Sequence, residues 1–242
     1  LMTNLFIASS LLHMYANSGF LSKAQEVFDM LAIRNVVTWN ALMTGYSKHA
    51  GYSEKTMESF EKMQHEGFTP DAFSFVLALK ACSALGARNK GLEIHTKICT
   101  LKMMEDDPYI GTSLVDMHVN CAFLTVAREI FKKLLCPDAI AWNVLIKGYV
   151  KHGYGEEALS YFHQMQKEGL SPNEVTLLCV LNACGHSGRL DEAQFYYDNM
   201  RRIYGIAPKL EHHTCMVVVF GCAGQFDKVM SVMKTTPCSN DP

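Results

Sequence analysis

The polar side chains with the most regular spacing lie in two nearly identical stretches, 103 residues apart. VVTWNALMTGYSK begins at Val36, and AIAWNVLIKGYVK begins at Ala139. If both are helices with ~100° per residue, an aliphatic residue, an asparagine and a lysine share one face in each copy. These residues are Val37, Asn40 and Lys48 in the first copy, and Ile140, Asn143 and Lys151 in the second. Asparagine can donate and accept hydrogen bonds and lysine carries a positive charge, so this is the chemistry of binding.

The opposite face of both stretches is apolar, which predicts that it packs into a core. Its members are Trp39, Leu42, Met43 and Tyr46 in the first copy, and Trp142, Leu145, Ile146 and Tyr149 in the second. Two alternatives apply to the polar face. The asparagines could satisfy backbone donors near a helix start, and the lysines could belong to an ordinary solvated surface.

Patterns for catalysis and metal binding are missing from the sequence. The nine cysteines form no C-x-x-C pair, and their odd number argues against a disulfide framework. The ten histidines form no H-E-x-x-H pattern, and the H-x-E and P-C-x-x-C patterns that zinc deaminases need do not occur. We therefore expect reduced, buried thiols, no metal, no cofactor and no catalytic activity in this chain.

The net charge and the hydropathy of the chain limit the classes of partner that it can bind. The formal net charge is −2 and the pI is about 6.6, so a nucleic-acid role would have to rest on local charge placement. The longest apolar runs, such as Cys215 to Phe220, are far shorter than the ~20 residues of a membrane-spanning helix, so no membrane partner is expected. The chain starts at Leu1 without the character of a signal or transit peptide, and we expect it to be a fragment or a trimmed product.

Smaller units repeat inside the 103-residue period. KACSALG from Lys80 returns as NACGHSG from Asn182, and these anchors divide the chain into seven segments. The segments span residues 5–35, 36–71, 72–107, 108–138, 139–173, 174–209 and 210–241. Each holds two apolar-periodic stretches joined by a short turn, which predicts a helical hairpin. Because one hairpin cannot bury its own apolar face, we predict an all-α fold, an α-solenoid superhelix of seven helix-turn-helix repeats with a concave inner surface.

Over almost its whole length the sequence resembles the pentatricopeptide repeat family, and its alternating segment lengths resemble the plant-type subclass of P, L and S repeats. VTWNALMTGY and IAWNVLIKGY are similar to P repeats, in segments 36–71 and 139–173. Segments 72–107 and 174–209 resemble L repeats, and segments 5–35, 108–138 and 210–241 resemble S repeats, which gives the order S-P-L-S-P-L-S. Thr56, His118, Ala122 and Val229 depart from the family pattern, and we expect these changes to affect the packing of single hairpins.

The resemblance implies a single-stranded RNA binder that recognises one base per repeat. In the family, the fifth residue of the first helix and the last residue of the same repeat select the base, while second-position side chains sandwich it. Carried onto this sequence, the pairs are Ser9 with Asn35, Asn40 with Asp71, Val76 with Asp107, Thr112 with Asp138, Asn143 with Asn173, Leu178 with Lys209, and Thr214 with Asp241. The stacking residues would be Phe6, Val37, Tyr109 and Ile140, and Lys48 and Lys151 would lie where a phosphate passes.

The family's pairing rule then gives an expected target, 5′-A-U-N-G-(C/U)-N-(G)-3′, read parallel to the chain. The two L repeats should discriminate poorly, because their fifth residues, Val76 and Leu178, are apolar. Asn40 with Asp71 would read uridine, and Asn143 with Asn173 would read cytidine and tolerate uridine.

The resemblance also implies a role as the targeting part of a C-to-U RNA editing factor in a mitochondrion or chloroplast. EHHTCMVVVFGCAGQFDKVM from Glu211 is similar to the family's final S repeat, which leads into a cytidine-deaminase-like DYW domain. Any deaminase would follow Pro242 or come from another protein of an editing complex. Two alternatives stay open: a family member acting in RNA splicing or stabilisation, and a tetratricopeptide-like scaffold for protein partners. Such a scaffold keeps a constant period of about 34 residues, which the varying segment lengths argue against.

Overall fold

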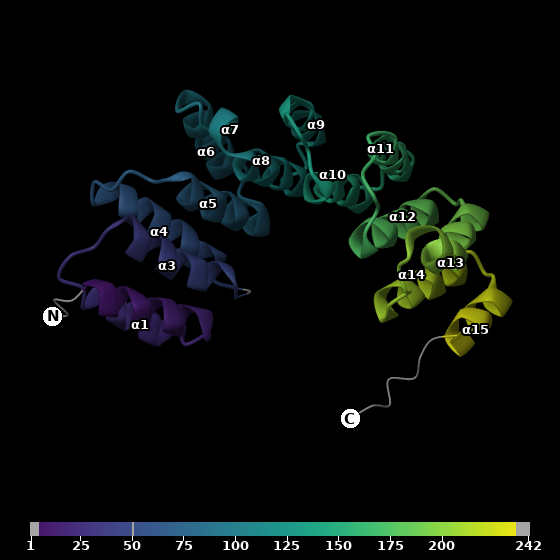
Figure 1. Cartoon of the computed structure of the whole chain (residues 1–242), viewed down its shortest axis with the longest axis horizontal. Helices are drawn as coiled ribbons and strands as arrows, with labels where there is room; N and C mark the ends of the chain where they lie inside the picture. Colours follow the sequence, from purple (N-terminus) through teal and green to yellow (C-terminus); the bar gives the residue numbers. More distant parts are fainter. Residues whose placement is uncertain (1–4, 50, 236–242) are drawn as a thin grey trace. The chain divides into compact units, whose positions relative to one another are not determined.

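The computed structural model describes residues 5–49 and 51–235, which form fifteen helices and no strand (Figure 1). The helices follow one another as hairpins: α1 (Leu5–Asn17) with α2 (Leu21–Asp29), α3 (Val36–Ser47) with α4 (Ser53–His65), α5 (Ala72–Leu85) with α6 (Arg88–Thr100), α8 (Pro108–Asn120) with α9 (Leu124–Lys133), α10 (Ala139–Lys151) with α11 (Gly155–Lys167), α12 (Glu174–His186) with α13 (Leu190–Tyr204), and α14 (Leu210–Cys222) with α15 (Phe226–Thr235). The predicted all-α class is confirmed. The division into S, P and L repeats stays a prediction.

The first helix of most hairpins begins directly after an asparagine or aspartate that caps it. The side chains of Asn35, Asp71, Asp107, Asp138 and Asn173 each accept a hydrogen bond from a backbone N–H in the first turn of α3, α5, α8, α10 and α12. A short oxygen-bearing side chain at this position satisfies a donor that the helix itself leaves unpaired. The sequence therefore marks the start of each of these helices locally.

The turn between the two helices of a hairpin needs a residue in the left-handed region of backbone space. Gly153, between α10 and α11, has φ 82°, whereas Ala122, between α8 and α9, has φ 65°. Glycine adopts this conformation without steric cost, but an alanine Cβ is strained there. The departure predicted to affect a single hairpin at Ala122 is therefore a local backbone strain.

The chain divides into two compact units, with the boundary between Ile130 and Phe131. In the first unit, α3 packs between α1 and α5, and α5 packs on α8. In the second unit, α12 packs between α10 and α14. Close packing of the first helices is clearest at Gly45, where an added Cβ would lie 2.7 Å from the Cβ of Ala16.

The predicted apolar stripe is buried in both copies, which confirms it as core. Trp39 packs edge-on against Phe28 with ring centroids 4.5 Å apart, and Trp142 packs in the same way against Phe131 at 4.7 Å. Such edge-to-face pairs add to the free energy gained by burying the rings. The two copies thus share one core design.

One expectation needs correction, and one helix was not predicted. Cys82, Cys121, Cys179, Cys184 and Cys215 are buried free thiols, but Cys99, Cys136 and Cys222 are exposed, so the prediction that the thiols are buried is wrong for these three. They lie in the last turn of α6, after α9 and in the last turn of α14, where helical ends leave the core. Cys238 lies outside the described residues. The four-residue helix α7 (Met103–Asp106) was not foreseen.

Candidate nucleic-acid interface

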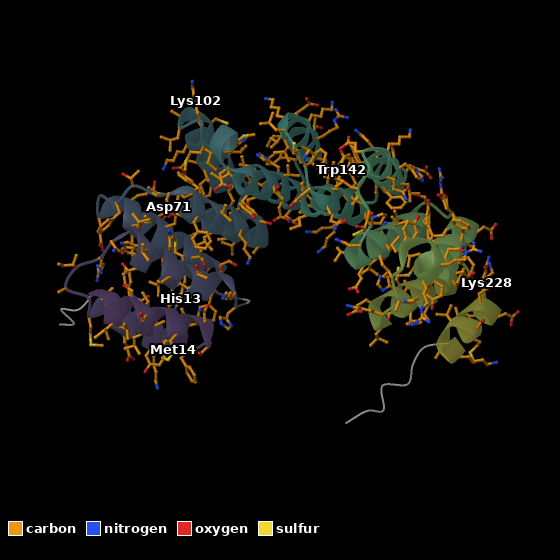
Figure 2. The ribbon with its side chains drawn as sticks, viewed as in Figure 1. His13, Met14, Asp71, Lys102, Trp142 and Lys228 are labelled. Atoms are coloured by element: carbon orange, nitrogen blue, oxygen red, sulfur yellow. The ribbon has the colours of Figure 1, made fainter. Side chains whose placement is uncertain are left out.

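Asn40 on α3 and Asp71 before α5, the first predicted pair of polar residues, lie in hydrogen-bond contact. Nδ2 of Asn40 donates to Oδ1 of Asp71 at 3.0 Å and to Oδ2 at 3.1 Å. Ser74 completes the group, because its Oγ lies 2.7 Å from Oδ1 of Asn40 and its backbone N–H donates to Oδ1 of Asp71 at 2.8 Å. Figure 2 labels Asp71 beside α4 and α5. We call Asn40, Asp71 and Ser74 the first asparagine network.

The second unit repeats the arrangement with one different residue. Nδ2 of Asn143 donates to Oδ1 of Asn173 at 3.1 Å, and the hydroxyl of Thr176 donates to Oδ1 of Asn143 at 2.7 Å. The backbone N–H of Thr176 donates to Oδ1 of Asn173 at 3.0 Å. We call Asn143, Asn173 and Thr176 the second asparagine network. A carboxamide therefore stands where the first network has a carboxylate.

The two asparagines are less exposed than a position opposite the core stripe suggested. Asn40 is 7% exposed and Asn143 is 8% exposed, because the start of the next hairpin covers each of them. The hydrogen bonds of the two asparagine side chains go to other side chains, so the alternative role of satisfying backbone donors at a helix start does not describe them. That role belongs instead to Asp71 and Asn173, the last residues of the two segments.

The double role of the last residues was missed in the sequence, although a signal for it was present. Asn35, Asp71 and Asn173 are each followed by serine or threonine three positions later, at Thr38, Ser74 and Thr176. This spacing is typical of reciprocal capping at a helix start, and all three capping boxes are formed. Capping explains why an asparagine or aspartate stands there; it does not explain the asparagine in the preceding helix.

The predicted stacking residues lie on the surface where their side chains are described. Val37, Tyr109 and Ile140 are exposed, while the side chain of Phe6 lies outside the described part. Phe73 on α5 and Val175 on α12 occupy the same second position and are also exposed, at 50% and 51%. Applying the second-position rule to every first helix would have found both.

Both lysines that were predicted to contact phosphate are exposed. Lys48 follows the last residue of α3 and is exposed, with its Nζ 2.5 Å from Oδ1 of Asn17. Lys151 ends α10 and is exposed. Lys80 and Lys147 are further exposed lysines on first helices, so the cationic groups on these helices extend beyond the predicted pair.

Two further predicted pairs, Val76 with Asp107 and Leu178 with Lys209, are not joined by a side-chain hydrogen bond in the part of the chain that the structure describes. Thr112 and Asp138 belong to different units. Ser9, Val76, Asp107 and Leu178 are half-buried, and Lys209 forms an ion pair with Glu174 at 2.5 Å. The hydroxyl of Thr214 donates to the backbone oxygen of Leu210 at 2.9 Å, and Asp241 lies outside the described residues.

Titratable groups near the core are held in their neutral forms. Burial, reinforced by the neighbouring His95, lowers the pKa of His118 to about 4, and its Nε2 lies 3.0 Å from Nδ1 of His95. Burial raises the pKa of Cys179 to about 11, so this thiol is a poor nucleophile at neutral pH. Over residues 5–49 and 51–235, no group of three or more histidine, cysteine or acidic side chains could hold a metal ion. Within those ranges no helix combines the length and apolar character needed to cross a membrane.

Comparison with known sequences gives a consistent set of relatives. The PPR repeat family matches residues 34–84 and 137–186, and the single PPR repeat matches residues 6–36 and 175–203, together more than half of the chain. The chain is 37% identical over 235 residues to the pentatricopeptide repeat-containing protein At4g38010 of Arabidopsis thaliana, covering 96% of this chain and 42% of the relative. It is 31% identical over 239 residues to the mitochondrial At2g03880 of the same plant, covering 99% and 37%. The chain spans less than half the length of these relatives.

Comparison with solved structures gives the same fold. PPR10 from maize, solved in complex with an 18-nt psaJ RNA element, superposes with a TM-score of 0.78 at 17% identity. The match covers 98% of this chain and 35% of that protein. At this identity the likeness establishes a shared fold.

Proposed function

The chain belongs to the pentatricopeptide repeat family, and on that premise we propose that it binds single-stranded RNA and reads a base with each asparagine network. The observation that carries the proposal is the recurrence of a fifth-position asparagine hydrogen-bonded to the last residue of its segment, at Asn40 with Asp71 and at Asn143 with Asn173. The structural relative PPR10 was solved with RNA, which supports this class of partner.

The two networks offer different chemistry to a base. In both, Oδ1 of the last residue is engaged by the backbone N–H of the helix that it caps. The second head-group atom is Oδ2 in Asp71, which can only accept, and Nδ2 in Asn173, which can only donate. Uridine carries a donor at N3 and cytidine an acceptor, so direct or water-mediated contact favours uridine at the first network and cytidine at the second.

The exposed second-position side chains supply the apolar part of the interface. Val37, Phe73, Tyr109, Ile140 and Val175 are exposed near the starts of their helices. Stacking of a base on such a platform contributes ~1 to 3 kcal/mol. With Ser9 and Asn35 reading adenine, Thr112 and Asp138 guanine, and Thr214 and Asp241 guanine, the proposed target remains 5′-A-U-N-G-(C/U)-N-(G)-3′.

The finer role proposed is that of the targeting part of a C-to-U editing factor in a plant organelle. Arabidopsis relatives, one of them named mitochondrial, support a plant and organellar setting. Because the sequence carries no deaminase pattern, the isolated chain should bind RNA without deaminating it. Conversion of cytidine to uridine by the purified chain alone would contradict this division of labour.

The test is fluorescence anisotropy with the proposed seven-base RNA placed inside a longer unstructured strand. We expect the purified chain to bind this RNA at least about tenfold more tightly than a strand with the same bases in scrambled order, and to bind its duplex weakly. The net charge of −2 predicts a shallow salt dependence, since few phosphates are neutralised. Equal affinity for both strands would contradict base reading, and no RNA binding alongside capture of peptide partners would favour the protein scaffold.

A further inference from the structure

A hydroxyl group from the next helix contacts each asparagine amide. Oγ of Ser74, in the first turn of α5, lies 2.7 Å from Oδ1 of Asn40, and Oγ1 of Thr176, in the first turn of α12, lies 2.7 Å from Oδ1 of Asn143. Both hydroxyl residues are completely buried. Neither residue lies at a fifth or last position, the two positions from which the base-reading residue pairs were assigned.

The way in which the oxygen and nitrogen of each asparagine amide point follows from neighbouring groups that can only donate or only accept a hydrogen bond. The backbone N–H of Thr176 can only donate, so it requires the oxygen of the Asn173 amide. Oδ1 of Asn173 then requires a donor from Asn143, which turns Nδ2 of Asn143 toward it and Oδ1 toward the Thr176 hydroxyl. In the first network the carboxylate of Asp71 imposes the same direction on Asn40.

The last residue sets this direction, and the hydroxyl adds the second contact, at the oxygen end of the amide. An amide turned over would direct its oxygen at Oδ1 of Asp71 or Asn173, where two acceptors would meet. With the hydroxyl removed, Oδ1 of Asn40 would lose its donor in a largely buried position, and the amide would gain from rotating toward water. The last residue therefore holds the nitrogen end of the amide, and the hydroxyl holds its oxygen end.

We infer that Ser74 and Thr176 are positioning residues for base selection: each fixes the orientation of the asparagine in the preceding hairpin and so sharpens the preference for one base. The inference rests on the proposed RNA function. It assigns part of the specificity of one segment to a residue of the next.

Thr38 provides a matched control in the same capping position. It also forms a capping box, with Asn35, but its hydroxyl donates to the backbone oxygen of Asn35 at 2.8 Å. Thr38→Val and Thr176→Val remove the same group from the same place in a first turn. Only the second change removes a donor from the side-chain amide of a fifth-position asparagine; the first removes a donor from a backbone oxygen.

The experiment measures RNA affinity with strands that differ only at the second or the fifth base of the target. Unchanged protein should prefer uridine over cytidine at the second base by about fivefold or more, the size of a typical single-base penalty. Ser74→Ala should reduce this ratio to about twofold or less while the ratio at the fifth base stays unchanged. Thr176→Val should weaken the preference at the fifth base only, and Ser74→Thr, which keeps the hydroxyl, should restore the first ratio.

The outcomes separate selection from general stability. A merely structural loss would weaken binding to every strand by the same factor, as we expect for Thr38→Val, and circular dichroism would show whether each variant is folded. Unchanged base ratios in folded Ser74→Ala and Thr176→Val would overturn the inference while leaving the RNA function intact. Thr176→Val tests it independently if Ser74→Ala does not fold. Failure of the unchanged chain to bind any strand would overturn the proposed function and the inference with it.

Discussion

In the first unit a carboxylate closes the network around Asn40, whereas in the second unit a carboxamide closes the network around Asn143. The helix caps need only Oδ1, which Asp71 and Asn173 both supply. The second head-group atom, Oδ2 or Nδ2, can therefore change without disturbing the cap. The cap thus uses one atom of the side chain, and the second atom, which in Asp71 also accepts from Asn40, is the one that the proposed function assigns to recognition.

The largest effect should come from the buried tryptophan that occupies the same core position in each copy. Trp39→Ala and Trp142→Ala should each lower the free energy of unfolding by about 3–5 kcal/mol, because both indoles are almost fully buried against an aromatic ring. Trp→Phe at either position should cost clearly less, since neither indole N–H has a hydrogen-bond partner to lose. Urea unfolding measures all four variants. Losses that differ strongly between Trp39 and Trp142 would break the equivalence of the two copies.

The next largest effect should be a pH dependence that His118 gives to the first unit. His118 lies on α8 at the position that Tyr149 occupies on α10. Its pKa falls from 6.5 to about 4 on folding, so it stabilises the fold fully above pH 6.5 and loses that contribution as the pH falls toward 4. The loss should reach about 2 kcal/mol by pH 5. His118→Tyr should make the free energy of unfolding depend less on pH between pH 7.5 and 5. An unchanged pH dependence in this variant would show that other groups cause it.

The smallest of the stability effects concerns the hairpin turns. Ala122→Gly should stabilise the α8–α9 hairpin by about 0.5–1 kcal/mol, because glycine relieves the strain at φ 65°. The reverse change in the other unit, Gly153→Ala at φ 82°, should destabilise by about 1 kcal/mol. Thermal unfolding of the two variants should show the gain in stability for Ala122→Gly and the loss for Gly153→Ala. A loss of stability in Ala122→Gly would show that the alanine methyl group contributes packing that outweighs its backbone strain.

Much of the fold could be predicted from the sequence because most first helices carry both of their determinants locally. The apolar stripe through Trp39 and Leu42 sets the buried face, and Asp71 or Asn173 sets the helix start. Four residues without an apolar period, Met103 to Asp106, gave no such signal for α7. The exposed Cys99 and Cys222 were missed because their positions in apolar segments do not show that the helix end leaves the core.

Only part of the candidate site could be predicted from the sequence. Repetition identified Asn40 and Asn143, and the structure places them in hydrogen-bond contact with Asp71 and Asn173; base reading by these pairs stays a prediction. The period of a single helix placed the asparagines on the face away from the core, where exposure is the ordinary expectation. Their burial and their bonds to Ser74 and Thr176 arise from the stacking of one hairpin on the next, which no single helix encodes.

The reciprocal exchange Asp71→Asn and Asn173→Asp tests the central claim most directly. Both residues cap helices well, so neither change should alter the unfolding free energy by more than about 0.5 kcal/mol. Competition binding should show the second-base preference moving from uridine toward cytidine in Asp71→Asn, and the fifth-base preference moving toward uridine in Asn173→Asp, each by ~1 kcal/mol or more. Base preferences that stay unchanged in both folded variants would contradict base reading by the asparagine networks.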